Sequence, residues 1–211
     1  MAISASRENI LKKIRKALSH STPLPFPQSE AKQAFFKPSS KELEIEFADQ
    51  FTILQGKFIY CLNHGELISQ LNNLLLHRQW NKVFCRDEKL KSVLRENNFE
   101  NFWDGSLHEC DVSITGCEAL VARTGSILLS SAQPGGRTVS VYAPVHICIA
   151  YVSQLVYDIK DALQFIKDKY KDQLPSLITF ATGPSRTADI EKTLVVGVHG
   201  PKEVYLMLVE A

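Results

Sequence analysis

Residues 182–191, with the sequence TGPSRTADIE, form the segment whose residue types and spacing could best carry chemistry. An apolar run leads through a glycine and a proline into this segment, and the pattern predicts a helix over residues 185–193. Anions bind at the first turn of a helix, because its backbone N–H groups are unpaired and it carries partial positive charge. The predicted donors of such an anion site are Gly183, Ser185, Arg186 and Thr187. Alternatively, Ser185 or Thr187 only caps the helix, which requires no ligand.

Two turns nearer the middle of the chain could also approach a ligand. One is Thr124-Gly125-Ser126, which precedes an apolar run, and the other is Gly135-Gly136, which precedes Arg137. Glycine lets a ligand come close to the backbone, and loops on a sheet often carry binding residues. We therefore add to the predicted ligand-binding residues Thr124, Gly125, Ser126 and Arg137. The alternative is that both segments are ordinary tight turns.

Two histidines and a glutamate are candidates for proton transfer or ligand contact. His146 starts an apolar run, and His199 stands beside Gly200 ahead of the last predicted strand. Imidazole titrates near neutral pH, so His199 is a candidate acid or base, as is Glu118, which we expect near residues 124–126. His146, His199 and Gly200 also join the predicted ligand-binding residues, although a structural role explains each equally well. No spacing typical of a metal site or a hydrolase triad accompanies them, so the sequence predicts no metal and no cofactor.

The composition is that of a soluble globular protein. The 211 residues are 45% hydrophobic, and 24 basic against 23 acidic residues give a net charge of +1. This balance disfavours a nucleic-acid partner, and the lack of a run of about 18 apolar residues argues against an integral membrane segment. The five cysteines form no C-x-x-C pair. Their odd number and scatter indicate reduced thiols in the cytoplasm rather than disulfides, zinc or an iron–sulfur cluster.

The N-terminal part of the chain is predicted to be a helical arm. Residues 5–18 have apolar side chains at helical spacing with basic side chains between them, and residues 21–27 contain three prolines. Residues 41–54 carry a second helical pattern. We therefore divide the chain into a helical arm with a proline-rich linker over residues 1–55 and an α/β domain over residues 56–211. The basic helix fits packing or docking on a partner better than binding to lipid.

The order of the remaining elements predicts a mixed, largely parallel sheet with helices on both faces. Strand, helix, strand, helix and strand alternate over residues 57–115, which is typical of parallel pairing. Three β runs then follow one another too closely for helical crossovers, at residues 126–131, 138–143 and 146–152. The other expected elements are a helix over residues 153–170, a strand over residues 176–181, the helix over residues 185–193 and a strand over residues 203–209.

The stretch over residues 110–209 resembles the lactate-utilisation protein C family, whose members have a single LUD domain. The resemblance rests on residues 124–126, on APVH at residues 143–146, on residues 182–191 and on VHGP at residues 198–201. The N-terminal half matches the family only in layout. One departure is Arg123, because family members commonly carry glutamate before the Thr-Gly pair.

The resemblance implies a fold like that of CoA transferases and ribose-phosphate isomerases, whose sites bind phosphorylated or CoA-linked ligands. It also implies action with iron–sulfur protein subunits in the oxidation of L-lactate to pyruvate. The chain would then be an accessory, non-redox subunit that binds a small anionic ligand at the loop of residues 183–187. The alternative is a free-standing enzyme acting on a phosphorylated or CoA-linked small molecule. The sequence leaves open whether the chain catalyses a reaction.

Overall fold

Two compact units make up the chain, Met1–Pro38 and Ser39–Ala211. The computed structural model describes residues 5–19, 39, 41–190 and 193–210. The first unit contains the helix α1 (Ala5–Leu18), which confirms the helix that the sequence predicts there. The proline-rich residues 21–27 lie outside the described residues. The second unit contains all the strands described below.

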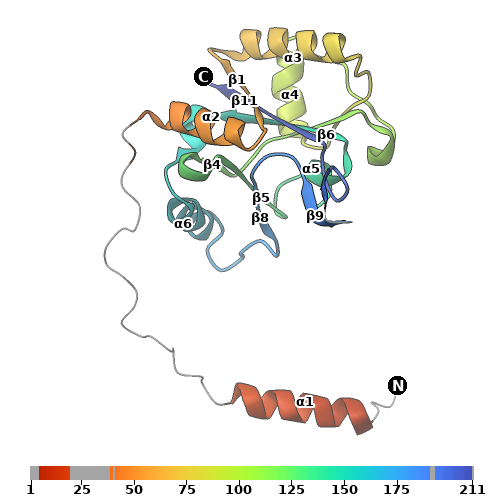
Figure 1. The fold of residues 1–211 in the computed structure, drawn as a ribbon, viewed down its shortest axis with the longest axis vertical. Coiled ribbons are helices and arrows are strands. Elements are labelled where there is room, and N and C mark those ends of the chain that lie inside the picture. The colour runs from red at the N-terminus through yellow and green to blue at the C-terminus, as the bar shows by residue number, and fades with distance from the viewer. Residues whose placement is uncertain (1–4, 20–38, 40, 191–192, 211) are drawn as a thin grey trace. The chain divides into compact units, whose positions relative to one another are not determined.

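A sheet of five parallel strands, the central sheet, forms the middle of the second unit (Figure 1). Its strand order is β1 (Lys57–Cys61), β11 (Glu203–Val209), β6 (Val145–Tyr151), β3 (Val112–Thr115) and β2 (Val83–Cys85). Successive residues of a strand point to opposite faces of a sheet. In β11, Tyr205 and Met207 therefore join one apolar cluster, and Leu206 and Leu208 join another on the opposite face. Apolar residues on both faces require a covering layer on each side of the sheet.

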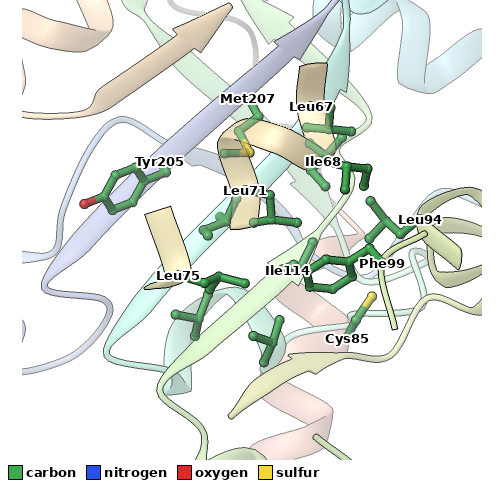
Figure 2. Packing of buried hydrophobic residues seen from close by; sticks show 14 of the residues in the cluster. Leu67, Ile68, Leu71, Leu75, Cys85, Leu94, Phe99, Ile114, Tyr205 and Met207 are labelled. Atoms are coloured by element: carbon green, nitrogen blue, oxygen red, sulfur yellow. The ribbon is translucent and has the colours of Figure 1, made fainter. Parts of the chain in front are cut away.

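Two helices cover one face of the central sheet. The side chain of Asn63 caps α3 (His64–Arg78), and the carboxylate of Asp87 caps α4 (Glu88–Glu96) by accepting backbone N–H groups of its first turn. Both helix starts agree with the sequence pattern. Figure 2 shows the buried apolar cluster that these helices share with the sheet, which includes Leu67, Leu71, Leu94, Ile114 and Met207.

A second sheet covers the other face of the central sheet. Its order is β7 (Leu155–Val156), β4 (Ala119–Val121), β5 (Ser126–Ser130) and β8 (Ile178–Ala181). Ile127 on its inner face shares an apolar cluster with Leu206 of the central sheet. Leu128 on its outer face packs with Ile166 of α6 (Ile159–Tyr170). The layers are therefore helix, central sheet, second sheet and helix.

The helix α2 (Leu43–Ile53) packs inside the second unit. Its residues Phe47 and Phe51 are fully buried, and their rings stack with centroids 5.4 Å apart. Both rings belong to the apolar cluster between the two sheets. Burial of two aromatic side chains on one face fixes this helix against the sheets.

The α/β fold with a largely parallel sheet and helices on both sides is confirmed, with local differences at four places, one of them residues 185–193. Residues 138–143, predicted as a strand, form the short helix α5 (Val139–Tyr142), because the N–H of Val139 bonds locally to the carbonyl of Gly135. The helix predicted from residue 153 begins only at Ile159. The 3-10 helix η3 (Val152–Gln154) and strand β7 come before it. Strand β4 was not predicted. The other 3-10 helices of the described residues are η1 (Leu107–Glu109) and η2 (Ala122–Thr124).

Candidate functional site

The helix predicted over residues 185–193 is wrong, because this segment forms two antiparallel strands. These are β9 (Arg186–Ile190) and β10 (Thr193–Val196), which pair Thr187 with Val195. β-Branched residues are frequent in both strands and fit a pleated ribbon better than a helix. The N–H of Ser185 donates to the carbonyl of Pro201 at 2.9 Å. There is consequently no helix N-terminus at this point to bind an anion.

Gly183 and Arg186 pack against the end of α2. Gly183 has a φ of +95°, and a Cβ at this position would lie 2.4 Å from the carbonyl oxygen of Leu54. The guanidinium Nη2 of Arg186 donates to the same oxygen at 2.6 Å. Helix C-terminal carbonyls attract cations, so this contact stabilises the end of α2. Gly183 and Arg186 therefore stabilise the end of α2, a structural role that the sequence did not predict.

The turn at residues 124–126 does lie beside the segment that begins at Thr182, as the sequence hypothesis requires. The hydroxyl of Ser126 is 2.7 Å from that of Thr124 and 3.2 Å from that of Thr182. Gly125 has a φ of +57°, and a Cβ there would lie 2.4 Å from the backbone nitrogen of Phe51. The turn is thus closed by α2, and its hydroxyls bond to one another.

His199 and Gly200 line an open pocket near the amino ends of β6 and β11, and Ser185 packs beside Gly200. His199, Gly200 and Lys202 line this pocket with Tyr142, and its free space is about 830 Å³ with the mouth included. A Cβ on Gly200 would lie 2.9 Å from Cβ of Ser185, so this serine is packed against the pocket wall. The side chains of His199 and Lys202 are exposed. An anion could therefore reach an imidazole and an ammonium group here.

Arg137 and His146 make their described contacts elsewhere. Arg137 is exposed, and its Nη2 donates to the hydroxyl of Ser176 at 2.7 Å. His146 is 1% exposed, and its Nε2 lies 2.8 Å from Oγ1 of Thr115. Burial lowers the pKa of His146 from its ordinary 6.5 to about 4, so the ring is neutral at physiological pH. The described contacts connect neither residue to His199.

Glu118 is a buried carboxylate with three donors. Its oxygens accept hydrogen bonds from the hydroxyl of Ser130 at 2.6 Å, Nζ of Lys169 at 2.7 Å and the phenol of Tyr170 at 2.7 Å. Burial alone would raise the pKa of Glu118, but these donors together hold that pKa below its usual value. A carboxylate that stays ionised and enclosed is poorly suited to proton transfer near neutral pH.

Glu118 also lies farther from the turn at residues 124–126 than the sequence suggests. Strands β4 and β5 are antiparallel, with Val121 opposite Ser126 and Ala119 opposite Leu128. Glu118 therefore stands at the far end of this strand pair. Arg123 pairs with Asp158 at 2.8 Å and thereby lowers the pKa of that carboxyl.

A second pocket lies at the carboxyl ends of β2 and β3, and of its lining residues the sequence analysis nominated only the Gly135-Gly136 turn. Arg86 follows β2, Thr115 ends β3, and both line the pocket together with Gly116 and the turn at residues 133–136. Ligands of parallel sheets commonly bind at the carboxyl ends of the strands. Polar residues and glycine directly after two adjacent predicted strands were the signal that could have found this pocket.

Within the described part of the chain, none of the helices has the length and apolarity needed to cross a bilayer. The same residues contain no cluster of three or more His, Cys, Asp or Glu side chains that could hold a metal ion.

The sequence and the fold were compared with known proteins. Over 104 residues the chain is 38% identical to lactate utilization protein C of Bacillus licheniformis, which covers 48% of this chain and 43% of that protein. An uncharacterized protein of Neisseria meningitidis is 28% identical over 66% of this chain and 61% of its own length. The chain thus spans about half the length of these curated relatives. Lactate utilization protein C of Anoxybacillus flavithermus is 29% identical over 82% of this chain and 83% of its own length.

The fold has a counterpart among solved structures. The crystal structure of a DUF162 family protein from Deinococcus radiodurans superposes with a TM-score of 0.59 at 18% identity. The superposition covers 82% of this chain and 99% of that one, so it supports the arrangement of the layers. The sequence model of the LUD domain matches residues 75–209, which include the central strands from β2 onward and the whole second sheet. Because this match covers more than half of the chain, the protein belongs to the LUD-domain family.

Proposed function

We propose that the protein is a non-redox component of a cytoplasmic L-lactate utilisation system, in which it binds a small anionic ligand and works with iron–sulfur protein subunits. Its relatives in Bacillus licheniformis and Anoxybacillus flavithermus are named lactate utilization protein C. Their names support the pathway. The burial of the thiols of this chain supports the second part of the proposal, that partner proteins carry the electrons.

The burial of all five thiols is the observation that carries the proposal. They lie in three separate apolar clusters, with Cys61 and Cys85 in one, Cys117 and Cys148 in another, and Cys110 in a third. Burial raises the pKa of Cys61, Cys85 and Cys110 to about 11 and raises that of Cys148 as well. Iron–sulfur clusters are ligated by thiolates that lie close together. Partner proteins would therefore carry the electrons, and free thiols fit the reducing cytoplasm.

The pocket of His199 and Lys202 is our proposed site for the anionic ligand. An ammonium and an imidazole flank the same open space. Ser185 packs beside Gly200, so the hydroxyl that the sequence nominates is within the same region. Gly183, Arg186 and the turn at residues 124–126 would support this region through α2 rather than touch the ligand.

Growth on L-lactate tests the pathway. Deleting the gene from its native host should abolish growth on L-lactate as sole carbon source, and the wild-type gene should restore it. The tagged protein should co-purify with the iron–sulfur subunits encoded in the same host. Normal growth of the deletion strain, or purification without these subunits, would refute the proposal.

Variants of the pocket test the ligand site separately. The double variant His199→Ala with Lys202→Ala should fail to restore growth, while Lys89→Ala, which removes an exposed cation from α4, should restore it. Both proteins must give the same circular dichroism spectrum. Full growth of the double variant would remove this pocket from the proposal and leave the pathway untouched.

A further inference from the structure

The outer side of α3 is an exposed surface without formal charge. From Leu67 to His77 this helix contains no Asp, Glu, Lys or Arg. Its exposed residues there include Asn72, Asn73 and Leu76. The helices α4 and α6, by contrast, carry both acidic and basic residues on their exposed sides. The surface of a helix is ordinarily charged on its solvent side, and charges are depleted at the centres of protein interfaces, so this face has the composition of an interface.

Leu76 projects from this surface rather than into the core. Figure 2 shows Leu67, Leu71 and Leu75 of the same helix in the buried cluster against the central sheet. Leu76, in contrast, is 80% exposed. In the view of Figure 1, no other element of the second unit lies over the outer side of α3. A single exposed leucine is common, so the surroundings of this one decide what it means.

A groove lies directly beside Leu76. Leu76 and Trp80 supply apolar surface to it, and Asn72, Gln79 and Asn101 supply side-chain amides. Its free space is about 910 Å³ with the mouth included, so an apolar side chain of another molecule has room in it. The exposed leucine therefore stands at the wall of a groove whose polar groups are neutral amides.

The wall formed by Trp80 is held in place by its neighbours. The ring of Tyr205 meets the indole edge-to-face with centroids 5.9 Å apart, and the guanidinium of Arg78 lies 5.0 Å from the indole centroid. The carboxylate of Asp111 accepts the backbone N–H groups of residues 81 and 82 at 2.9 Å each, which fixes the turn that follows Trp80. A groove that is formed in advance loses little conformational entropy when it is filled.

A two-fold symmetric homodimer accounts for the lack of charge on this face. Both copies contribute the same patch to such an interface, so a residue near the axis meets its own counterpart. A lysine or glutamate there would meet a like charge, whereas an amide has donors and an acceptor and can pair with its own copy. Interfaces between different proteins commonly use complementary charges, and this face offers none. The charge pattern therefore fits a second copy of this chain.

We propose that the outer side of α3 is the interface of a two-fold symmetric homodimer, in which Leu76 of each copy lies in the groove of the other. There it contacts the apolar surface of Leu76 and Trp80, and the amides around the groove hydrogen-bond across the axis. The inference goes beyond the proposed function and does not depend on it, because this groove and the pocket of His199 have no lining residue in common.

Sedimentation velocity of the purified full chain tests the interface. At about 50 μM the wild type should sediment as a dimer with twice the chain mass of 23.7 kDa. Leu76→Glu should raise the Kd of dimerisation by about 100-fold or more, because the apolar contact is lost and two carboxylates face each other across the axis. The matched control Ile53→Glu, at a residue of α2 that is 71% exposed, should dimerise like the wild type. All three proteins must give the same circular dichroism spectrum.

Opposite charges at residue 76 test the symmetry. Leu76→Lys alone should lose dimerisation as Leu76→Glu does, because two ammonium groups then face each other. When the two variants are mixed in equal amounts, the Kd of the mixed dimer should be at least about tenfold lower than that of either variant alone. Residue 76 meets its own counterpart only in a two-fold interface. A mixture that associates no better than its components would overturn the two-fold arrangement.

Two further results would overturn the proposal. A wild type that stays monomeric up to about 200 μM would do so, and the uncharged face of α3 would then belong to a different partner protein. A wild-type dimer that Leu76→Glu leaves as tight as the Ile53→Glu control would also do so, because its interface would lie elsewhere on the chain.

Discussion

Glu118 and His146 are both buried ionisable residues, but at neutral pH Glu118 is charged and His146 is neutral. Glu118 is 2% exposed and ionised, and it accepts hydrogen bonds from Ser130, Lys169 and Tyr170. His146 is 1% exposed and neutral, and its contact is the hydroxyl of Thr115. Burial disfavours the charged form of both groups. The difference lies in what surrounds each of them.

The comparison teaches that donors and a counter-charge can outweigh the cost of burial, so that a buried group keeps its charge. Lys169 is half exposed, so its ammonium remains hydrated while it neutralises Glu118. His146 is buried in the central sheet, and no carboxylate faces it among the contacts described for that region. One residue can therefore serve as a structural anchor for α6, and the other as a rigid neutral partner for a hydroxyl.

The largest effect is expected from Glu118→Ala. This variant leaves the hydroxyls of Ser130 and Tyr170 without an acceptor, and the free energy of unfolding should fall by about 3 kcal/mol. Chemical denaturation at pH 7 measures the loss. The control Glu100→Ala, at an exposed glutamate, should change stability by less than about 0.5 kcal/mol. Equal losses in both variants would mean that the three hydrogen bonds of Glu118 stabilise nothing.

Acidification should destabilise the folded protein, because His146 is buried in its neutral form. Because its pKa is about 4 in the folded protein and near 6.5 in the unfolded chain, the unfolded chain binds the proton first as the pH falls. The free energy of unfolding should therefore decrease by about 2 kcal/mol between pH 8 and pH 5 through this residue. The stabilisation that neutral His146 contributes is fully present above pH 6.5 and is lost progressively as the pH falls from 6.5 toward 4.

Denaturation curves of wild type and His146→Gln across this pH range isolate that contribution. In His146→Gln, the free energy of unfolding should no longer fall through this residue between pH 8 and pH 5. In His77→Gln, at an exposed histidine of α3, the fall should be the same as in the wild type. A wild-type curve that is flat between pH 8 and pH 5 would contradict a neutral, buried His146.

Removing the single described partner of His146 should cost less than removing Glu118. Thr115→Val keeps the shape of the side chain but leaves a buried ring nitrogen without its hydroxyl, and the expected loss is about 1.5 kcal/mol. Thr115→Ser should recover most of this loss in the same denaturation experiment. Identical stabilities of the valine and serine variants would mean that the contact has no energetic weight.

The parts of the fold that local signals determine were predictable from the sequence. Asn63 and Asp87 cap α3 and α4, and a cap depends only on residues within one helical turn. The parallel strands β1, β2 and β3, which alternate with these helices, follow from short apolar runs. Residues 185–193 and 138–143 were mispredicted because the partner strand, or its absence, decides between helix and strand there.

The site depended on contacts between residues far apart in the chain. The partners of Glu118 stand 12, 51 and 52 residues away, and Thr115 and His146 are 31 residues apart. No spacing pattern in the sequence predicts contacts between residues so far apart. The sequence did nominate Glu118 as a candidate acid or base and His146 as a candidate ligand-binding residue, but only the packing of α6 and β3 reveals the contacts of each one.

The smallest change in stability, and the sharpest test of the comparison, is expected from Lys169→Met. The substitution keeps much of the apolar stem but removes the ammonium, so Glu118 keeps two hydroxyl donors and loses its counter-charge. Because Lys169 is about half exposed, the loss at pH 7 should be no more than about 1 kcal/mol. The pKa of Glu118 should rise, and carbon-13 NMR of its carboxyl group measures that change. The stability difference should shrink as the pH falls below about 4.5, the ordinary pKa of glutamate, and should vanish once the pH is below the lower pKa of Glu118 in the folded wild type. If Glu118 stayed fully ionised in this variant, the hydroxyl donors alone would account for its charge, and the contrast with His146 would be one of hydrogen-bond number rather than of counter-charge.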